Sequence, residues 1–315
     1  MSLPTSTHTT YTQVGQREDL SDIIYNVDPT DTPFMSGIER EKATAVNHEW
    51  QTQALAAVDT ANAVLEGDDA VTDAATPTVR LGNICQISDK VGRVSGTARA
   101  ITVAGRDDEL AYQQVLKGKE LKRDMEAILL ASQVKNTGAA ATARALAGIN
   151  AWIATNDDFD SGGSSPSPID GTDARNDGTQ RAFTEAQLKN VFQLCWTSGG
   201  KPDIVMLGGF NKQVMSTFTG RATPTEDTKA KKIVASVDAY ESDFGTVKVV
   251  PNRFQRTRDC HVLEMDKWAV AYLRKFESEP LAKTGDSDRF QIRSEYTLVA
   301  RNEKSSGGVY DLTTS

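Results

Sequence analysis

Few side chains in this sequence have the types and spacing that catalysis or metal binding requires. The three histidines, His8, His48 and His261, are far apart, and only His261 has a cysteine beside it. Cys260 and His261 fall in a predicted strand, where neighbouring side chains point to opposite faces, so a thiol–imidazole pair is not expected. The histidines and cysteines also lack the spacing of a metal site. We therefore expect no catalytic residue, no metal site and no cofactor.

Two short motifs could suggest ligand binding, but a simpler interpretation is favoured for each. Residues 198–202 (Ser-Gly-Gly-Lys-Pro) are like the end of a phosphate-binding loop, yet the upstream glycine is missing and no Ser or Thr follows the lysine. A turn between a helix and a strand explains them better. Residues 157–160 (Asp-Asp-Phe-Asp) lack the ligand pattern of a calcium loop. They are predicted to be a solvated acidic loop.

The composition narrows the class of protein. The chain has 315 residues with 38% hydrophobic and 7% aromatic content. These values are low for one compact globule of this length, which suggests that part of the chain is buried against neighbours. The net charge of −8 argues against a coat that binds nucleic acid by charge attraction. Three separate cysteines predict free thiols, and we expect neither a membrane span nor a signal peptide.

The N-terminal segment has the pattern of a short helix that needs a partner surface. Four apolar residues have the i, i+3, i+4, i+7 spacing of an amphipathic helix: Leu20, Ile23, Ile24 and Val27. Pro29 and Pro33 are expected to end this helix, because proline lacks an amide donor and restricts the residue before it. The resulting arm, which ends near Phe34, has no core of its own and must dock elsewhere.

A long hairpin is predicted next. Residues 45–52 and 79–87 alternate between polar and apolar like two strands, and residues 59–77 between them are rich in Ala, Asp, Thr and Gly. A two-stranded ribbon of this kind is unstable alone, so we expect it to lie across a second subunit.

The spacing of apolar residues predicts one long helix over residues 107–136. Asp107 and Asp108 suit its positive N-terminal end, and residues 136–138 (Asn-Thr-Gly) supply a stop signal. Gly118 lies inside this helix, where glycine is unfavourable. It either marks a bend or permits close packing, and packing is favoured.

The second half of the chain is predicted to be an α/β region. Residues 156–182 have the composition of a linker or exposed loop. Thr184 and Gln187 then have capping-box spacing and begin a helix. A buried strand at 202–209, a further helix at 210–218 and strands at 244–251, 260–266, 268–276 and 290–299 follow.

Several of these segments resemble one protein family. Residues 15–24 (Gly-Gln-Arg-Glu-Asp-Leu-Ser-Asp-Ile-Ile) and 32–34 (Thr-Pro-Phe) are similar to the opening of major capsid proteins of tailed bacteriophages. The order of hairpin, long helix and α/β region agrees with that family. The resemblance implies an α+β fold of the Hong Kong 97 type, with these parts: N-terminal arm 1–40; extended loop 41–95; peripheral domain 96–155 and 277–315, with a spine helix at about 107–136; linker or exposed loop 156–182; axial domain 183–276.

The resemblance also implies a function. We expect a structural subunit, not an enzyme, that forms pentamers and hexamers of an icosahedral phage head around packaged double-stranded DNA, which it contacts weakly. Assembly in the host cytoplasm and a final location in the virion follow. The expected partners are other copies, a portal, a decoration protein and a separate scaffolding protein, because the chain enters its arm almost at once. An encapsulin-like compartment and, less favoured, a cytosolic α/β enzyme stay as alternatives.

Charge patterning gives a hypothesis for subunit contacts. From residue 47 to 81 the chain has six acidic residues and one basic residue, Arg80, whereas the predicted spine helix carries a basic cluster. The acidic loop of one subunit could lie over the basic helix of the next, although two ordinary solvated faces are an equal alternative. The predicted contact residues are Arg17, Leu20, Ile23, Ile24, Phe34, Glu66, Asp68, Asp69, Lys117, Lys119, Lys122 and Arg123. No lysine occurs between Lys42 and Lys90, so we expect no covalent cross-link from the loop tip.

Overall fold

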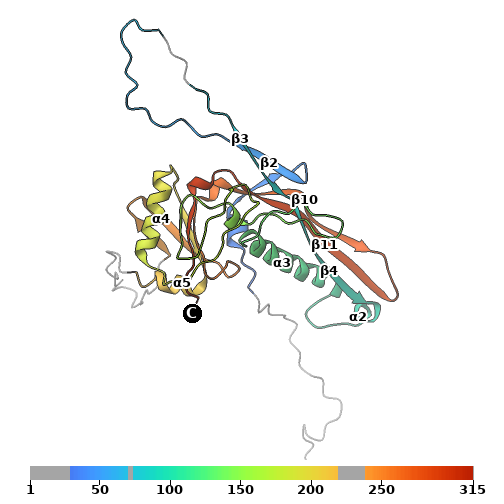
Figure 1. Cartoon of the computed structure of the whole chain (residues 1–315). Coiled ribbons are helices and arrows are strands. Elements are labelled where there is room, and N and C mark those ends of the chain that lie inside the picture. Colours follow the sequence, from blue (N-terminus) through green and yellow to red (C-terminus); the bar gives the residue numbers. More distant parts are fainter. Residues whose placement is uncertain (1–28, 70–73, 219–237, 315) are drawn as a thin grey trace, which may run out of the picture.

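The computed structural model describes residues 29–69, 74–218 and 238–314. In this part the chain forms a four-stranded sheet, a six-stranded sheet and a separate two-stranded ribbon. Their arrangement can be followed in Figure 1. The ribbon continues into a loop that extends away from both sheets. The mixed content of helices and strands agrees with the predicted α+β class.

The first sheet is built around a long antiparallel hairpin. Its strand order is β1 (Glu39–Lys42), β10 (Trp268–Leu281), β11 (Ser287–Ala300) and β4 (Gln86–Ser95). Only β1 and β10 run parallel. The short helix α2 (Gly96–Ala100) follows β4, and helix α3 (Glu109–Leu129) packs on β4 and β11.

Helix α3 begins close to where the sequence predicts and ends earlier. Asp108 caps it, since its Oδ1 accepts a hydrogen bond from the Leu110 amide at 3.0 Å. The helix ends at Leu129, not near residue 136. Asn136 instead pairs with Ala145 across a turn in which Gly138 has a φ of +77°. The stop signal at 136–138 therefore belongs to a later turn.

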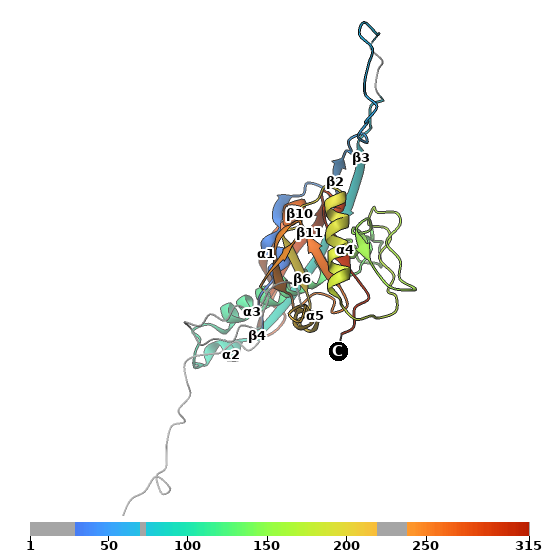
Figure 2. The same ribbon diagram turned by 90° about the vertical axis from the view of Figure 1, so that its left-hand side faces the viewer.

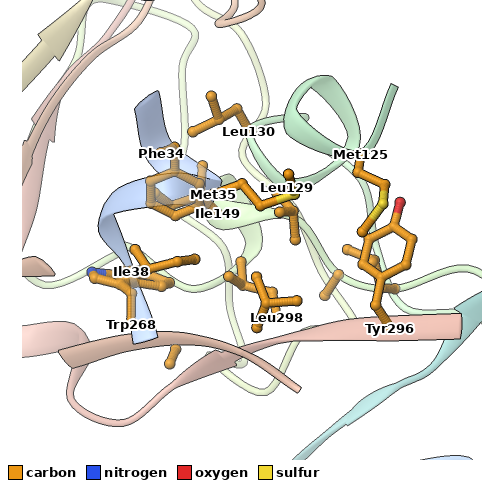
Figure 3. Close-up of a cluster of buried hydrophobic side chains, with 14 of the residues drawn as sticks. Phe34, Met35, Ile38, Met125, Leu129, Leu130, Ile149, Trp268, Tyr296 and Leu298 are labelled. Atoms are coloured by element: carbon orange, nitrogen blue, oxygen red, sulfur yellow. The ribbon is translucent and has the colours of Figure 1, made fainter. Parts of the chain in front are cut away.

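The main core lies between α3 and the four-stranded sheet, as Figure 3 shows. Met125 and Leu129 of α3 face Tyr296 and Leu298 of β11. The rest of the cluster shown there includes Phe34, Met35, Ile38, Leu130, Ile149 and Trp268. The first three come from helix α1 (Pro33–Gly37) and the residue after it. Pro33 thus begins helix α1, where its missing amide is harmless. The helix that the two prolines were predicted to end lies outside the described residues.

The second sheet carries two helices. Its order is β5 (Asp157–Asp158), β12 (Gly307–Val309), β9 (Cys260–Leu263), β6 (Ile204–Leu207), β8 (Gly245–Pro251) and β7 (Ala239–Ser242). Helix α4 (Glu185–Thr197) has the predicted capping box between Thr184 and Gln187 and buries Leu188, Val191, Phe192 and Cys195. Helix α5 (Gly209–Met215) follows β6. Short 3-10 turns complete the chain at Ile149–Ala151, Met265–Lys267 and Glu303–Ser305.

The two sheets divide the sequence differently from the predicted segments. Residues 268–276, grouped above with 183–276, form part of β10 in the four-stranded sheet. The end of the chain, grouped above with 277–315, returns as β12 to the six-stranded sheet between β9 and β5. Strands β1 and β4 belong to the four-stranded sheet and not to the arm or the loop. These pairings join residues distant in sequence, so local patterns do not reveal them.

Residues 156–182, predicted to be a linker or exposed loop, are mostly loop, but part of the segment is buried. Asp157 and Asp158 form β5, and Arg175 is 4% exposed. The Arg175 guanidinium pairs with Asp157 and lies 3.6 Å from the ring centroid of Tyr310. Composition indicated a solvated segment, whereas paired charges hold it against the end of the chain.

Candidate assembly surfaces

The base of the extended loop is fixed firmly to the body. Strands β2 (Asn47–Thr52) and β3 (Val79–Ile84) pair in antiparallel register, as the alternation predicts. The buried Asn83 side chain donates to the carbonyls of Leu298 at 2.8 Å and Ala147 at 3.1 Å and accepts from the Ala147 amide at 2.8 Å. Trp50 packs on Trp152 with ring centroids 5.3 Å apart. The loop therefore starts from a rigid base.

Beyond Thr52 the described residues of the loop, 53–69 and 74–78, are almost all exposed and have little contact with the two sheets. Figure 2 shows it standing clear of both sheets. Leu55 and Val58 are 95% and 92% exposed, and Val64 and Leu65 are nearly as exposed. Large apolar side chains at this exposure indicate a surface that another molecule covers. Glu66, Asp68 and Asp69, three of the predicted contact residues, are also exposed here.

The predicted basic residues of α3 differ in their availability. Lys117 pairs with Glu120 at 2.8 Å. Lys122 lies 5.9 Å from the ring centroid of Phe276, and the guanidinium of Arg123 lies 5.6 Å from that of Phe254. Lys119 is exposed, and no ion pair to it occurs within the described ranges. None of the loop acids pairs with these four residues in the described part of one chain.

The predicted arm contacts give one correction. Arg17, Leu20, Ile23 and Ile24 lie outside the described residues. Phe34 is fully buried, 6.4 Å from Trp268 between ring centroids, so it is a core residue of its own chain. The prediction that Phe34 contacts another subunit is therefore wrong, because α1 carries it into the core between α3 and β10.

A buried carboxylate that the sequence analysis did not single out joins three parts of the molecule. Glu126 of α3 is fully buried and accepts from the backbone amides of Phe34 and Met35, both at 2.8 Å. The Asn252 side chain, just after β8, donates to it at 2.7 Å. Burial raises the pKa of Glu126, although these three hydrogen bonds oppose the shift. The available signal was an acidic residue beside Met125 on the apolar face of α3.

Among the described residues, the histidines and cysteines lack an arrangement for catalysis, and His8 lies outside them. His261 is buried, and its Nε2 lies 2.8 Å from Asn150 Oδ1. Burial lowers the pKa of His261 to about 3, which keeps the ring neutral. Cys260 packs in the core of the six-stranded sheet, and burial raises its thiol pKa. Across the described ranges, no three His, Cys, Asp or Glu residues are grouped to hold a metal ion.

Among the helices of the described residues, none combines the length and the apolar character needed to cross a bilayer.

Comparison with known sequences identifies relatives of the whole chain. Residues 3–313 match the family model of the SU10 major capsid protein. The chain is also 30% identical to the major capsid protein of Escherichia phage Phieco32, over 95% of each protein. Both matches span the arm, the loop and the two sheets.

Comparison with solved structures agrees. A chain of the cyanophage A-1(L) capsid asymmetric unit superposes with a TM-score of 0.66 at 14% identity, covering 97% of this chain and 98% of that one. A chain from Gordonia phage Cozz gives 0.64 at 10% identity, covering 100% and 99%. A chain from the capsid of a native GTA particle gives 0.60 at 9% identity, covering 96% and 98%.

These findings confirm the Hong Kong 97-type fold. They make the chain a structural subunit of a phage head and not an enzyme, and none of these relatives supports an encapsulin-like compartment. The chain belongs to the SU10 major capsid protein family.

Proposed function

We propose that this capsid protein forms pentamers and hexamers of an icosahedral shell that encloses packaged double-stranded DNA. The extended loop is the observation that carries the proposal. Its four large apolar side chains are exposed in a single chain, and burying each one is worth about 1.5–3 kcal/mol. A loop laid over the next copy supplies that burial, and repeating the same contact around an axis closes a ring.

The two sheets take different positions in this shell. The unit of α3 and the four-stranded sheet corresponds to the peripheral domain, with α3 as the spine helix. The six-stranded sheet with α4 and α5 corresponds to the axial domain, which meets its copies around the five-fold and six-fold axes. Support comes from the order of these units along the chain and from the similarity to capsid chains over almost the full length.

Charge contributes weakly to the loop contact in this proposal. Glu66, Asp68 and Asp69 of one copy approach basic residues of the next, with Lys119 the best-placed residue on α3. Exposed ion pairs are worth about 0–1 kcal/mol each, so they matter through repetition over the shell. The net charge of −8 suits a shell that contains DNA by geometry with weak contact.

Assembly needs other proteins. We propose a separate scaffolding protein, a portal at one vertex and assembly in the host cytoplasm before release in the virion. A decoration protein on the outer surface is a further partner. A structural neighbour supports this, because a chain from Phage G belongs to a structure described as major capsid proteins and decoration proteins.

Electron microscopy of a matched pair of loop variants tests the proposal. The Leu55→Ser/Val58→Ser variant removes two apolar side chains and leaves the folded body unchanged, so we expect soluble subunits with few or no closed shells. The control, Ala56→Ser/Ala57→Ser, changes neighbouring small residues and is expected to form shells. Normal shells from the first variant, or uniform monomers from the unaltered protein with its scaffold, would contradict the proposal.

A further inference from the structure

One face of helix α3 is open in its first three turns. Ala111, Val115, Gly118 and Lys122 have the spacing of a single helix face, and Val115 is 58% exposed. A Cβ atom built on Gly118 meets nothing within 4 Å. The packing role expected for Gly118 is therefore not found within the described chain. The glycine lowers helix stability relative to alanine and gains no contact in return.

The same face is covered further along the helix. Glu126 follows Lys122 by four residues, so it lies on this face one turn later. Here the N-terminal chain covers α3, because the amides of Phe34 and Met35 donate to the Glu126 carboxylate at 2.8 Å. The start of α1 thus lies on the side of α3 that is open nearer the beginning of the helix. Residues 29–32 connect α1 to residues 17–28 in the sequence.

We propose that residues 17–27 form an amphipathic helix that packs lengthwise on the open face of α3 in the same chain. This segment lies outside the described residues. Its eleven residues span about 16 Å as a helix, and the open face from Ala111 to Lys122 spans about 16 Å. The two helices run parallel, with Leu20 near Val115 and Ile23 and Ile24 near Gly118.

The two faces are complementary in shape. The segment offers a stripe of large apolar side chains, Leu20, Ile23, Ile24 and Val27. The α3 face offers Ala111, Val115 and Gly118, whose small size allows the helix axes to approach closely. Close packing of this helix on α3 would explain the glycine at position 118, which has no packing role among the described residues.

The two faces are also complementary in charge. Residues 17–28 contain one basic residue, Arg17, and four acidic residues, Glu18, Asp19, Asp22 and Asp28. Lys122 lies on the open face and Lys119 beside it, and both are exposed.

A disulfide test on assembled shells decides the occupant. The three native cysteines are buried, which leaves introduced thiols as the reactive ones. Oxidised shells of the Leu20→Cys/Val115→Cys variant are expected to give a monomer with an internal disulfide, seen as faster migration without reductant and the loss of two free thiols. The control is Leu20→Cys/Trp196→Cys, which places the second thiol on exposed α4 and should stay unlinked.

The other results of this test overturn the proposal. Disulfide-linked dimers or longer ladders from Leu20→Cys/Val115→Cys would place the arm of a second copy on α3. Efficient linkage of Leu55→Cys/Val115→Cys would place the extended loop there. No linkage in shells of normal appearance would also remove the proposal, while leaving the shell function proposed above intact.

A second measurement uses trypsin cleavage after Arg17. A docked arm protects this bond, so we expect slow cleavage in the unaltered protein. In the Gly118→Leu variant the new side chain blocks close helix approach, and cleavage is expected to accelerate. Leucine is a better helix former than glycine, so faster cleavage cannot be assigned to a weaker α3. Equal cleavage rates in the two proteins would overturn the proposal.

Discussion

Residues 53–78 and residues 150–182 are two long segments with little regular structure, yet they behave in opposite ways. Both are rich in small and polar residues. The first was predicted to lie across a second subunit, and residues 156–182 of the second were predicted to be a linker or exposed loop. The first extends away from the body with Leu55 and Val58 almost fully exposed. The second wraps the end of the chain and buries Asn150, Asn156 and Arg175.

The difference lies in the partners available to their charges. Acidic residues in 150–182 meet basic residues from both near and far: Asp157 pairs with Arg175, and Asp177 with Arg256 and Arg258. Between residues 53 and 78 the chain has acidic residues and no basic one. Composition alone does not separate a solvated segment from a packed one. The balance of opposite charges does, since burial of a charge requires a partner.

Substitution of Arg175, the buried cation of residues 150–182, should have the largest effect on the stability of the subunit. In Arg175→Met, the buried Asp157 loses its partner, and the stacking on Tyr310 changes. Breaking a buried pair from one side costs about 3–5 kcal/mol, so we expect a much lower urea midpoint for the unassembled subunit or an insoluble chain. Arg80→Met is the control, because Arg80 lies on the exposed hairpin. Equal urea midpoints for the two variants would show that the ion pairs of residues 150–182 do not stabilise the subunit more than the exposed hairpin does.

The next largest expected effect is a change in the free energy of unfolding with pH, caused by Asp259. Burial raises the pKa of this carboxyl to about 6, although Arg256 and Asn150 oppose the shift. The folded protein thus holds a proton that the unfolded chain releases near pH 4, so this group's contribution to stability falls as the pH rises from about 4 to about 6, by about 3 kcal/mol.

Asp259→Asn lacks this titration. The difference in unfolding free energy between the unaltered protein and the variant, measured by urea at several pH values, should therefore change over that range and be constant above it. Parallel curves from pH 4 to 7 would show that the network around Arg175 holds Asp259 ionised throughout.

Reversing the loop charges should have a smaller effect, confined to the shell. Glu66→Lys/Asp68→Lys/Asp69→Lys is expected to leave subunit unfolding unchanged, because these side chains are exposed. It should loosen assembled shells at low salt by about 0–1 kcal/mol per contact and less at high salt. The measurement is the temperature at which shells release their contents, at two salt concentrations. A variant shell as stable as the original at both would remove the charge contribution.

The smallest expected effect is none at all. Because no lysine lies between Lys42 and Lys90, shells boiled in detergent without reductant should give one monomer band. A ladder of oligomers under those conditions would show covalent links from another part of the chain.

Local patterns predicted the elements that depend on nearby residues. The capping box and buried stripe of α4 and the start of α3 at Asp108 were read correctly, and so were the strands of the hairpin. The motif at 15–34 placed the chain in its family.

Features made by distant residues were missed. Phe34 was assigned to an interface because it ends an arm that has no core of its own. Its position between α3 and β10 depends on residues more than 80 positions away. The return of β12 to the six-stranded sheet and the burial of Arg175 and Glu126 likewise need partners that no local spacing reveals.

The Glu126 carboxylate has a mechanical consequence for any change in shape of the shell. Its two oxygens accept hydrogen bonds from the start of α1, which precedes β1, and from the residue after β8. Glu126 therefore connects α1, α3 and the end of β8 at one point. The six-stranded unit cannot turn on α3 without either taking the N-terminal chain with it or leaving a buried donor unpaired, which costs about 1–3 kcal/mol. A rotation of this kind must therefore overcome the same threshold in every copy around the shell.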